Sequence, residues 1–132
     1  MLFRSHPPIE EFVDLAMAVI NEKGIARRTT IQSFDPRPLQ VMQNKYPSIG
    51  TALLIEDDDK RTLDEQLMQL GFTPVIYSPH FSLVNAALVK QCKEKGIKII
   101  PWTVNTIEEM KKQKALGVDG IISDYPNLFS QL

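Results

Sequence analysis

Residues 83–105, LVNAALVKQCKEKGIKIIPWTVN, contain one complete helix–strand–turn unit, and this unit repeats along the chain. Apolar side chains recur at helical spacing as far as Glu94, and Gly96 follows just before the largely apolar run Ile97–Ile100. The turn Trp102–Asn105 closes the unit. Because glycine adopts the left-handed conformation without a Cβ penalty, we expect Gly96 to end a helix that leads into a short buried strand.

The same unit recurs along the chain. Helices are predicted over about residues 9–22, 38–45, 63–70, 83–94 and 107–116, and strand-like runs over residues 29–34, 51–55, 74–77, 97–100 and 120–123. Glycines 24, 71, 96 and 117 are expected to end helices, and Thr106 to cap the start of the last one. Strands that alternate with helices of this length form parallel crossovers, so the fold class is α/β. No glycine-rich dinucleotide fingerprint or phosphate loop follows any strand, which argues against a nucleotide-binding doubly wound sheet.

The length sets how much of a fold this sequence can form. A chain of 132 residues is sufficient for a single α/β domain over residues 1–132. A complete eight-stranded barrel typically needs about 250 residues, so five strand-like runs predict the C-terminal part of a TIM (β/α)8 barrel. Such a piece would expose two parallel sheet edges, and self-association through those edges is expected.

Composition and charge narrow the classes of partner and location. The hydrophobic content of 43% and charged content of 23% are typical of soluble globular proteins, and a net charge of −1 gives no reason to expect nucleic acid as a partner. No apolar run approaches the roughly 20 residues that span a bilayer. Because Met1–His6 lacks the apolar core of a signal peptide, a cytoplasmic location is expected, with an export signal on a longer parent chain as the open alternative. The single cysteine, Cys92, is expected to be a small, partly buried hydrophobe.

Candidate site residues lie where the strand-like runs end, because carboxyl ends of parallel strands build the active site of a barrel. Ser33 can donate a hydrogen bond to a phosphate, and Phe34 can pack against an apolar part of a substrate. The alternative, a simple turn in which Asp35 caps the next helix, is favoured on shape alone. Trp102 offers a flat apolar wall and one N–H donor, so pocket lining is slightly favoured over core filling.

Three further groups at strand ends can be interpreted either as catalytic or ligand-binding residues or as purely structural ones. His80 can act as a general acid or a phosphate donor, but a histidine without a paired acid nearby in sequence is more often structural. Glu56–Asp59 is interpreted as a solvated acidic turn, since four adjacent acids cannot all converge on one ion. A structural role is also favoured for Asp124. No Ser/His/Asp triad, glutamate pair or metal-spaced histidine cluster is visible, so no catalytic residue or metal ligand is assigned.

Three stretches together resemble the C-terminal half of the glycerophosphodiester phosphodiesterase family. They are Ile31–Asp35, Gly96–Asn105 and Gly117–Pro126, and the similarity runs from about Pro7 onward, with Ser123 where many members carry threonine. The resemblance implies a (β/α)8 barrel that hydrolyses glycerophosphodiesters, such as deacylated phospholipids, to glycerol 3-phosphate and an alcohol. It also implies a divalent cation, calcium or magnesium, held by carboxylates, and two histidines that act as acid and base.

The family's motifs for that chemistry precede its Ser-Phe-Asp segment. They are His-Arg-Gly, Glu-x-Asp, a second His-Asp and Glu-x-Lys, and residues 1–28 contain none of them. Only substrate-pocket residues carry over: Trp102 and Phe34 as apolar lining, with Ser33 and His80 beside them. The expected protein is therefore a fragment of a phosphodiesterase that binds a small phosphodiester and is inactive alone.

Two other interpretations stay open. One is a non-catalytic half-barrel that serves as a binding or assembly module. The other is a different phosphate-handling barrel enzyme that would rely on Glu56, His80 and Asp124. The sequence leaves undecided the alcohol part of the substrate, the identity of the metal, the oligomeric state and whether Met1 is a native start.

Overall fold

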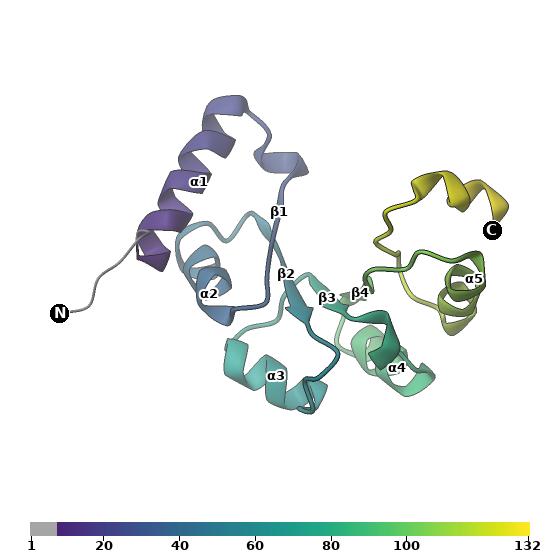
Figure 1. Ribbon diagram of the computed structural model, residues 1–132. Helices are drawn as coiled ribbons and strands as arrows, with labels where there is room; N and C mark the ends of the chain where they lie inside the picture. Colours follow the sequence, from purple (N-terminus) through teal and green to yellow (C-terminus); the bar gives the residue numbers. More distant parts are fainter. Residues whose placement is uncertain (1–7) are drawn as a thin grey trace.

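The computed structural model describes residues 8–132, which form a series of alternating helices and strands (Figure 1). The predictions for Met1–His6 and Pro7 lie outside the described residues. The α-helices are α1 (Ile9–Lys23), α2 (Pro36–Lys45), α3 (Leu63–Leu70), α4 (Ala86–Glu94) and α5 (Ile107–Leu116). The strands are β1 (Thr30–Ser33), β2 (Gly50–Ile55), β3 (Ile76–Pro79) and β4 (Lys98–Ile99), and short 3-10 helices occupy η1 (Ala26–Arg28), η2 (Phe81–Leu83) and η3 (Pro126–Gln131).

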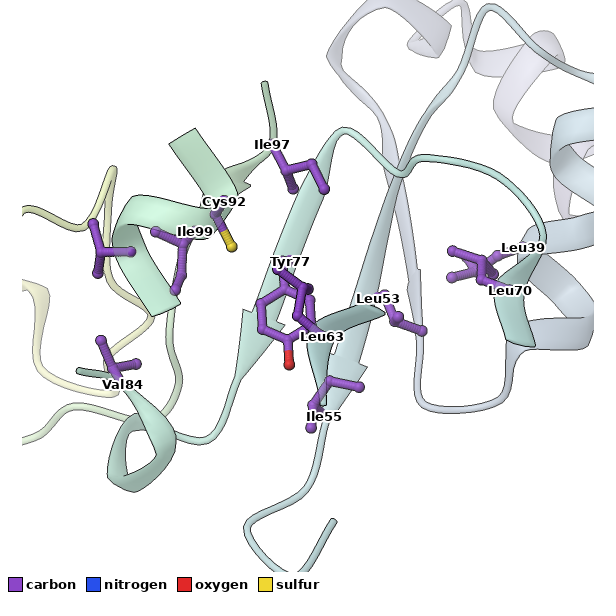
Figure 2. Close-up of a cluster of buried hydrophobic side chains, with 11 residues drawn as sticks. Leu39, Leu53, Ile55, Leu63, Leu70, Tyr77, Val84, Cys92, Ile97 and Ile99 are labelled. Atoms are coloured by element: carbon purple, nitrogen blue, oxygen red, sulfur yellow. The ribbon is translucent and has the colours of Figure 1, made fainter. Parts of the chain in front are cut away.

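The strands form one parallel sheet in the order β1-β2-β3-β4, as the alternating pattern predicted. The register places Leu53 beside Tyr77 and Tyr77 beside Ile99, so these side chains share one face of the sheet. That face packs against α2, α3 and α4 in the main hydrophobic core (Figure 2). The core consists of Leu39, Leu53, Ile55, Leu63, Leu70, Tyr77, Val84, Val89, Cys92, Ile97 and Ile99.

The opposite face of the sheet has a different character. Gln32 is exposed there, while Leu54 and Ile76 are half-buried. The strands therefore have one apolar face under helices and one more open face.

Local signals set most helix ends. The φ angles of Gly71 and Gly117 are +87° and +89°, which only glycine adopts easily, and all four predicted glycine stops have positive φ. Thr62 and Glu65 form a reciprocal capping box at the start of α3. The Thr106 side chain accepts a hydrogen bond from the Glu109 backbone N–H, which confirms the predicted cap of α5.

The fifth predicted strand, residues 120–123, is wrong as a regular strand. Backbone hydrogen bonds still join this segment to β4 and to the residues that follow β4. Asp119 N donates to Ile99 O at 2.9 Å, and Ile122 N donates to Pro101 O at 2.9 Å. Pro101 has no N–H to return, so the ladder is interrupted there. Residues 119–122 therefore continue the sheet as an irregular segment.

Several predicted boundaries also shift by one to three residues, and two of these shifts have a clear local reason. Helix α4 begins at Ala86 instead of Leu83, because Asn85 caps it and accepts the Leu88 N–H at 2.8 Å, while Phe81–Leu83 forms a separate 3-10 turn. Strand β3 begins at Ile76, two residues later than expected, because Pro74 cannot donate to the ladder.

A second, smaller core joins α1 to the rest of the fold. Val13 and Met17 on α1 pack with Met42 on α2 and with Ile49. The Lys45 ammonium bridges the carboxylates of Glu10 and Asp14 at 2.9 and 2.8 Å across the same two helices. None of the helices in residues 8–132 has the length and apolarity that a membrane crossing requires.

Leu39 tests the importance of the main core. Its side chain is fully buried, so Leu39→Ala is expected to lower the free energy of unfolding by about 2–5 kcal/mol through lost apolar contact and a residual cavity. Urea denaturation followed by circular dichroism measures the change. Met68→Ala on α3 is the matched control, because Met68 is 82% exposed and its truncation should cost less than about 0.5 kcal/mol. Equal losses in both variants would contradict the assignment of the core.

Candidate functional site

The candidate site lies where the strands end. Because the strands are parallel, the turns after them meet at one edge of the sheet. Ser33 and Phe34 stand at the end of β1, Glu56 follows β2, and His80 follows β3. Trp102 stands beyond β4 and forms an isolated parallel bridge with His80.

Aromatic rings from three of these turns contact one another, and we call Phe34, His80, Phe81 and Trp102 the aromatic cluster. The rings of Phe34 and Trp102 meet edge to face with centroids 5.6 Å apart. Trp102 also meets His80 edge to face at 5.0 Å, and His80 stacks on Phe81 at 4.5 Å. Phe34 follows the first strand of the sheet and Trp102 the last, so this contact joins the two sides of the sheet at its carboxyl edge.

Backbone groups fix the position of Trp102. Its indole Nε1–H donates to the Ser78 carbonyl at 2.9 Å, and its backbone N–H donates to the Pro79 carbonyl at 3.1 Å. The indole N–H is thus engaged within the chain, and the ring surface is what Trp102 can offer a ligand. The Ser78 hydroxyl donates to the Ile100 carbonyl at 2.6 Å, which ties β3 to the strand beyond it.

The turn after β1 is built by short-range hydrogen bonds. The Asp35 carboxylate accepts the Arg37 backbone N–H at 2.9 Å, so Asp35 caps α2 as the alternative interpretation predicted. The Arg37 guanidinium also hydrogen-bonds to this carboxylate and holds the pKa of Asp35 below its usual value. The Ser33 hydroxyl oxygen accepts the Asp35 N–H at 3.0 Å, so it helps to shape the turn that presents Phe34.

The turn after β2 is acidic, and its residues differ in exposure. Glu56, Asp57 and Asp58 are exposed, as a solvated turn predicts. Asp59 differs, because its side chain is only 15% exposed and pairs with Arg61 at 2.7 Å. The hydrogen bonds from Arg61 lower the pKa of Asp59 from its usual 3.8 to about 2.

A cavity of about 250 Å³ lies beside this pair, and Phe34, Glu56 and Arg61 are among the residues that line it. Gln66 supports its wall, because the buried amide donates to the Arg61 carbonyl at 3.2 Å and accepts from the Tyr77 hydroxyl. Sequence reasoning missed Arg61 and Gln66. The Asp-x-Arg spacing of residues 59 and 61 was a usable signal for the ion pair, whereas only the fold brings Gln66 to Tyr77.

The turn after residues 119–122 is also tied to its neighbour. The Asn105 amide oxygen accepts the Asp124 N–H at 2.9 Å, and its nitrogen donates to the Asp124 carboxylate at 3.0 Å. The Ser123 hydroxyl donates to the same Asn105 oxygen at 3.2 Å. Asp124 therefore holds a loop in place, in agreement with the structural role favoured for it.

The described residues do not form a metal site by themselves. Within residues 8–132, no three His, Cys, Asp or Glu side chains are grouped so that they could hold a metal ion. Cys92 is fully buried in the main core, and burial raises the pKa of its thiol to about 11, so it is a small core side chain.

Comparison with known proteins identifies the family to which these features belong. The model of the “Glycerophosphoryl diester phosphodiesterase family” matches residues 6–128, nearly the whole chain. The chain belongs to this family. A glycerophosphodiester phosphodiesterase of Caldanaerobacter subterraneus subsp. tengcongensis is 30% identical over 127 residues, which cover 96% of this chain and 50% of that protein. A Bacillus subtilis glycerophosphodiester phosphodiesterase is 27% identical over 103 residues, covering 77% of this chain and 35% of that protein.

Solved structures give the same fold. The structure of a glycerophosphodiester phosphodiesterase from Parabacteroides distasonis superposes with a TM-score of 0.79 at 23% identity, over 96% of this chain and 53% of that one. An Oleispira antarctica phosphodiesterase, in complex with the product sn-glycerol-3-phosphate, superposes with a TM-score of 0.77 at 21% identity, over 93% and 49% of the two chains. The predicted fold class, part of a TIM (β/α)8 barrel, is confirmed. The chain spans about half the length of these barrels. The phosphodiesterase family is generally metal-dependent.

The Asp59–Arg61 pair predicts a specific response to acid. Because the pKa of Asp59 is lower in the folded protein than its usual 3.8, the pair stabilises the fold above about pH 4, and this stabilisation is lost as the pH falls toward 2. Asp59→Asn removes the titrating group, so the variant should lose less stability than the wild type over that interval. Urea midpoints at several pH values test this. Asp57→Asn, at an exposed position of the same turn, should respond to acid as the wild type does, and an identical response from Asp59→Asn would contradict the role of the pair.

Proposed function

We propose that this chain forms the carboxyl-terminal part of a phosphoric diester hydrolase of the glycerophosphodiester phosphodiesterase type. The reaction adds water to a glycerophosphodiester, breaks the ester bond between phosphorus and the alcohol, and gives glycerol 3-phosphate and that alcohol. The observation that carries the proposal is the contact between Phe34 and Trp102 at the carboxyl edge of the sheet, where barrel enzymes bind their substrates. Membership of the family supports the same reaction.

We assign the aromatic cluster to one wall of the substrate pocket. Phe34 is 48% exposed and Trp102 is half-buried, so both rings have surface available to a ligand. Such rings cover the C–H face of a glycerol or alcohol group and exclude water from it. Ser33 directly precedes Phe34 and shapes its turn, and the His80 ring contacts Trp102. Both contacts support the predicted pocket set of Trp102, Phe34, Ser33 and His80.

The groups that activate water are proposed to come from outside the described residues, because these residues contain no carboxylate cluster that fits a divalent cation. In the family such a cation, predicted to be calcium or magnesium, neutralises charge on the phosphoryl group. This chain by itself is therefore expected to be inactive. A cytoplasmic location likewise stays a prediction.

A chimera tests the function. The purified chain, given glycerophosphocholine with calcium or magnesium, should release no glycerol 3-phosphate above background. Fusing it to the unmatched half of the Caldanaerobacter relative, in place of that protein's own matching half, should restore metal-dependent release. Within the chimera, Trp102→Ala should raise KM roughly tenfold, the effect of losing about 1.4 kcal/mol of contact, while Met68→Ala should leave it unchanged.

Three results would contradict this proposal. Release by the chain alone would disprove its inactivity. A folded chimera without activity, or one that tolerates Trp102→Ala, would disprove the pocket wall.

A second candidate function is assembly, and α1 is the observation that favours it. Phe12, Leu15 and Val19 are 60%, 57% and 54% exposed, and their spacing places them on one face of the helix. A groove of about 200 Å³ runs beside them, lined mainly by apolar side chains of α1, β1 and α2. In the described part of the chain, β1 pairs only with β2, so its outer edge is open.

We infer that a second copy of this chain covers these surfaces. Helix α1 stands at one end of the series of elements and η3 at the other (Figure 1). The η3 end also exposes apolar side chains, which are Ile122, Tyr125, Phe129 and Leu132. Two copies related by a twofold axis can place the α1 end of each against the η3 end of the other, so both apolar surfaces are buried in one closed dimer.

Sedimentation measures this association directly. The chain should sediment as a dimer, and Leu15→Glu should shift it toward monomer because a charge enters the buried contact. Met68→Glu is the matched control, since it adds the same charge at an exposed position on α3 and should leave the dimer intact. A wild-type monomer at every concentration, or equal weakening by both substitutions, would overturn the dimer.

A further inference from the structure

The His80 side chain has one ring nitrogen whose role is determined by its neighbours. The Ser82 backbone N–H donates to His80 Nδ1 at 3.2 Å, and the Ser82 hydroxyl oxygen lies 2.7 Å from the same nitrogen. A backbone amide can only donate, so Nδ1 must present its lone pair. In a neutral imidazole the proton then resides on Nε2.

We propose that Ser82 holds His80 as the Nε2–H tautomer, and that this N–H donates a hydrogen bond to an oxygen of the bound phosphodiester. The inference rests on the proposed function, because it places His80 at the same pocket wall as Trp102. It makes His80 a substrate-binding residue whose neutral ring has a defined tautomer.

The loop that carries His80 is held from several elements. The His80 backbone N–H donates to the Ile55 carbonyl at 2.8 Å, and the Phe81 N–H donates to the Trp102 carbonyl at 2.8 Å. The Phe81 carbonyl in turn accepts from the buried Gln113 amide on α5 at 3.3 Å. A donor fixed in this way loses little conformational freedom when it binds a ligand.

Two aromatic neighbours fix the plane of the imidazole ring. The ring stacks on Phe81 and meets Trp102 edge to face. Within the described residues, Nδ1 has hydrogen-bond partners and Nε2 has none. The His80 side chain is half-buried, so part of it is accessible from solvent. The Nε2–H is therefore the one polar group of this side chain that is available to a ligand.

The tautomer decides which chemistry His80 can perform. Nε2 already carries a proton and cannot accept another, while Nδ1 is occupied by Ser82, so the neutral ring is not poised as a general base. A neutral N–H is instead a good donor to an uncharged or anionic oxygen. A hydroxyl of the glycerol group and a phosphate oxygen share this acceptor chemistry.

Nitrogen-15 NMR of the full chain tests the tautomer without any ligand. At a pH where the ring is neutral, we expect the His80 Nε2 signal to have the shift of a protonated ring nitrogen and Nδ1 that of an unprotonated one. The chain has two histidines, so His6→Ala leaves the His80 signals alone in the spectrum. The opposite tautomer, or an even mixture of the two, would overturn the inference.

Titration of the same sample with glycerol 3-phosphate tests the contact. The His80 Nε2–H and Trp102 Nε1–H signals should both move, and the indole signal is unambiguous because the chain has one tryptophan. His80→Phe keeps an aromatic ring without the donor and should weaken binding about tenfold, the effect of losing one hydrogen bond. His80→Gln, which retains an N–H donor, should recover part of that loss.

Separate titrations with glycerol and with inorganic phosphate show which oxygen accepts the bond, since only the matching probe should move the Nε2–H signal. If glycerol 3-phosphate moves Trp102 but not His80, or if His80→Phe binds as well as the wild type, the His80 inference fails and the pocket wall stands. If neither signal moves, both the His80 contact and the Trp102 pocket wall are contradicted, and the chimera assay decides the hydrolase function separately.

Discussion

In a parallel sheet the chain must cross back to the starting end of the sheet after each strand before it can form the next one. Here helices α2, α3 and α4 make these connections between β1, β2, β3 and β4. The returning helices cover one face of the sheet and bury Leu53, Tyr77 and Ile99 against α2, α3 and α4. The same constraint gathers all the turns that follow strands at one edge. The parallel arrangement of the strands therefore accounts for both the main core and the position of the candidate site.

At that edge, polar groups do the positioning and aromatic rings provide the surface. The indole N–H of Trp102 is used on the Ser78 carbonyl, and the Phe81 carbonyl is used by Gln113 on α5. Because these groups are satisfied within the chain, Trp102 and the backbone at Phe81 are held in place without depending on a ligand. The Phe34 and Trp102 rings make an apolar surface there, and the Ser82 N–H engages Nδ1 of the neighbouring His80 ring.

The irregular places in the fold have identifiable chemical reasons. Pro101 breaks the ladder beyond β4, so residues 119–122 run beside it without forming a regular strand. Asn85 moves the start of α4 beyond the short η2 turn, and this turn is what brings Ser82 under the imidazole of His80. Both departures from the regular repeat thus lie next to the candidate site.

The sequence alone was sufficient for the features that depend on local chemistry. Helical periodicity, the glycine stops at Gly71 and Gly117, the caps at Asp35 and Thr106, and the parallel α/β class all follow from neighbouring residues, because helix ends and backbone angles are decided within a few positions. The resemblance to the phosphodiesterase family likewise came from short motifs at the ends of predicted strands. The family comparison agrees with it.

Tertiary structure decided everything that joins distant parts of the chain. Phe34 meets Trp102 across 68 positions, from 34 to 102, and Gln66 meets Tyr77, only because the register of the sheet and the seating of its helices bring them together. The same holds for α1, where Val13 and Met17 are buried while Phe12, Leu15 and Val19 on the same apolar helix are exposed. Periodicity marks which residues are apolar, but only the arrangement of neighbouring elements determines which of them are covered, because burial is a property of the surroundings and not of the residue.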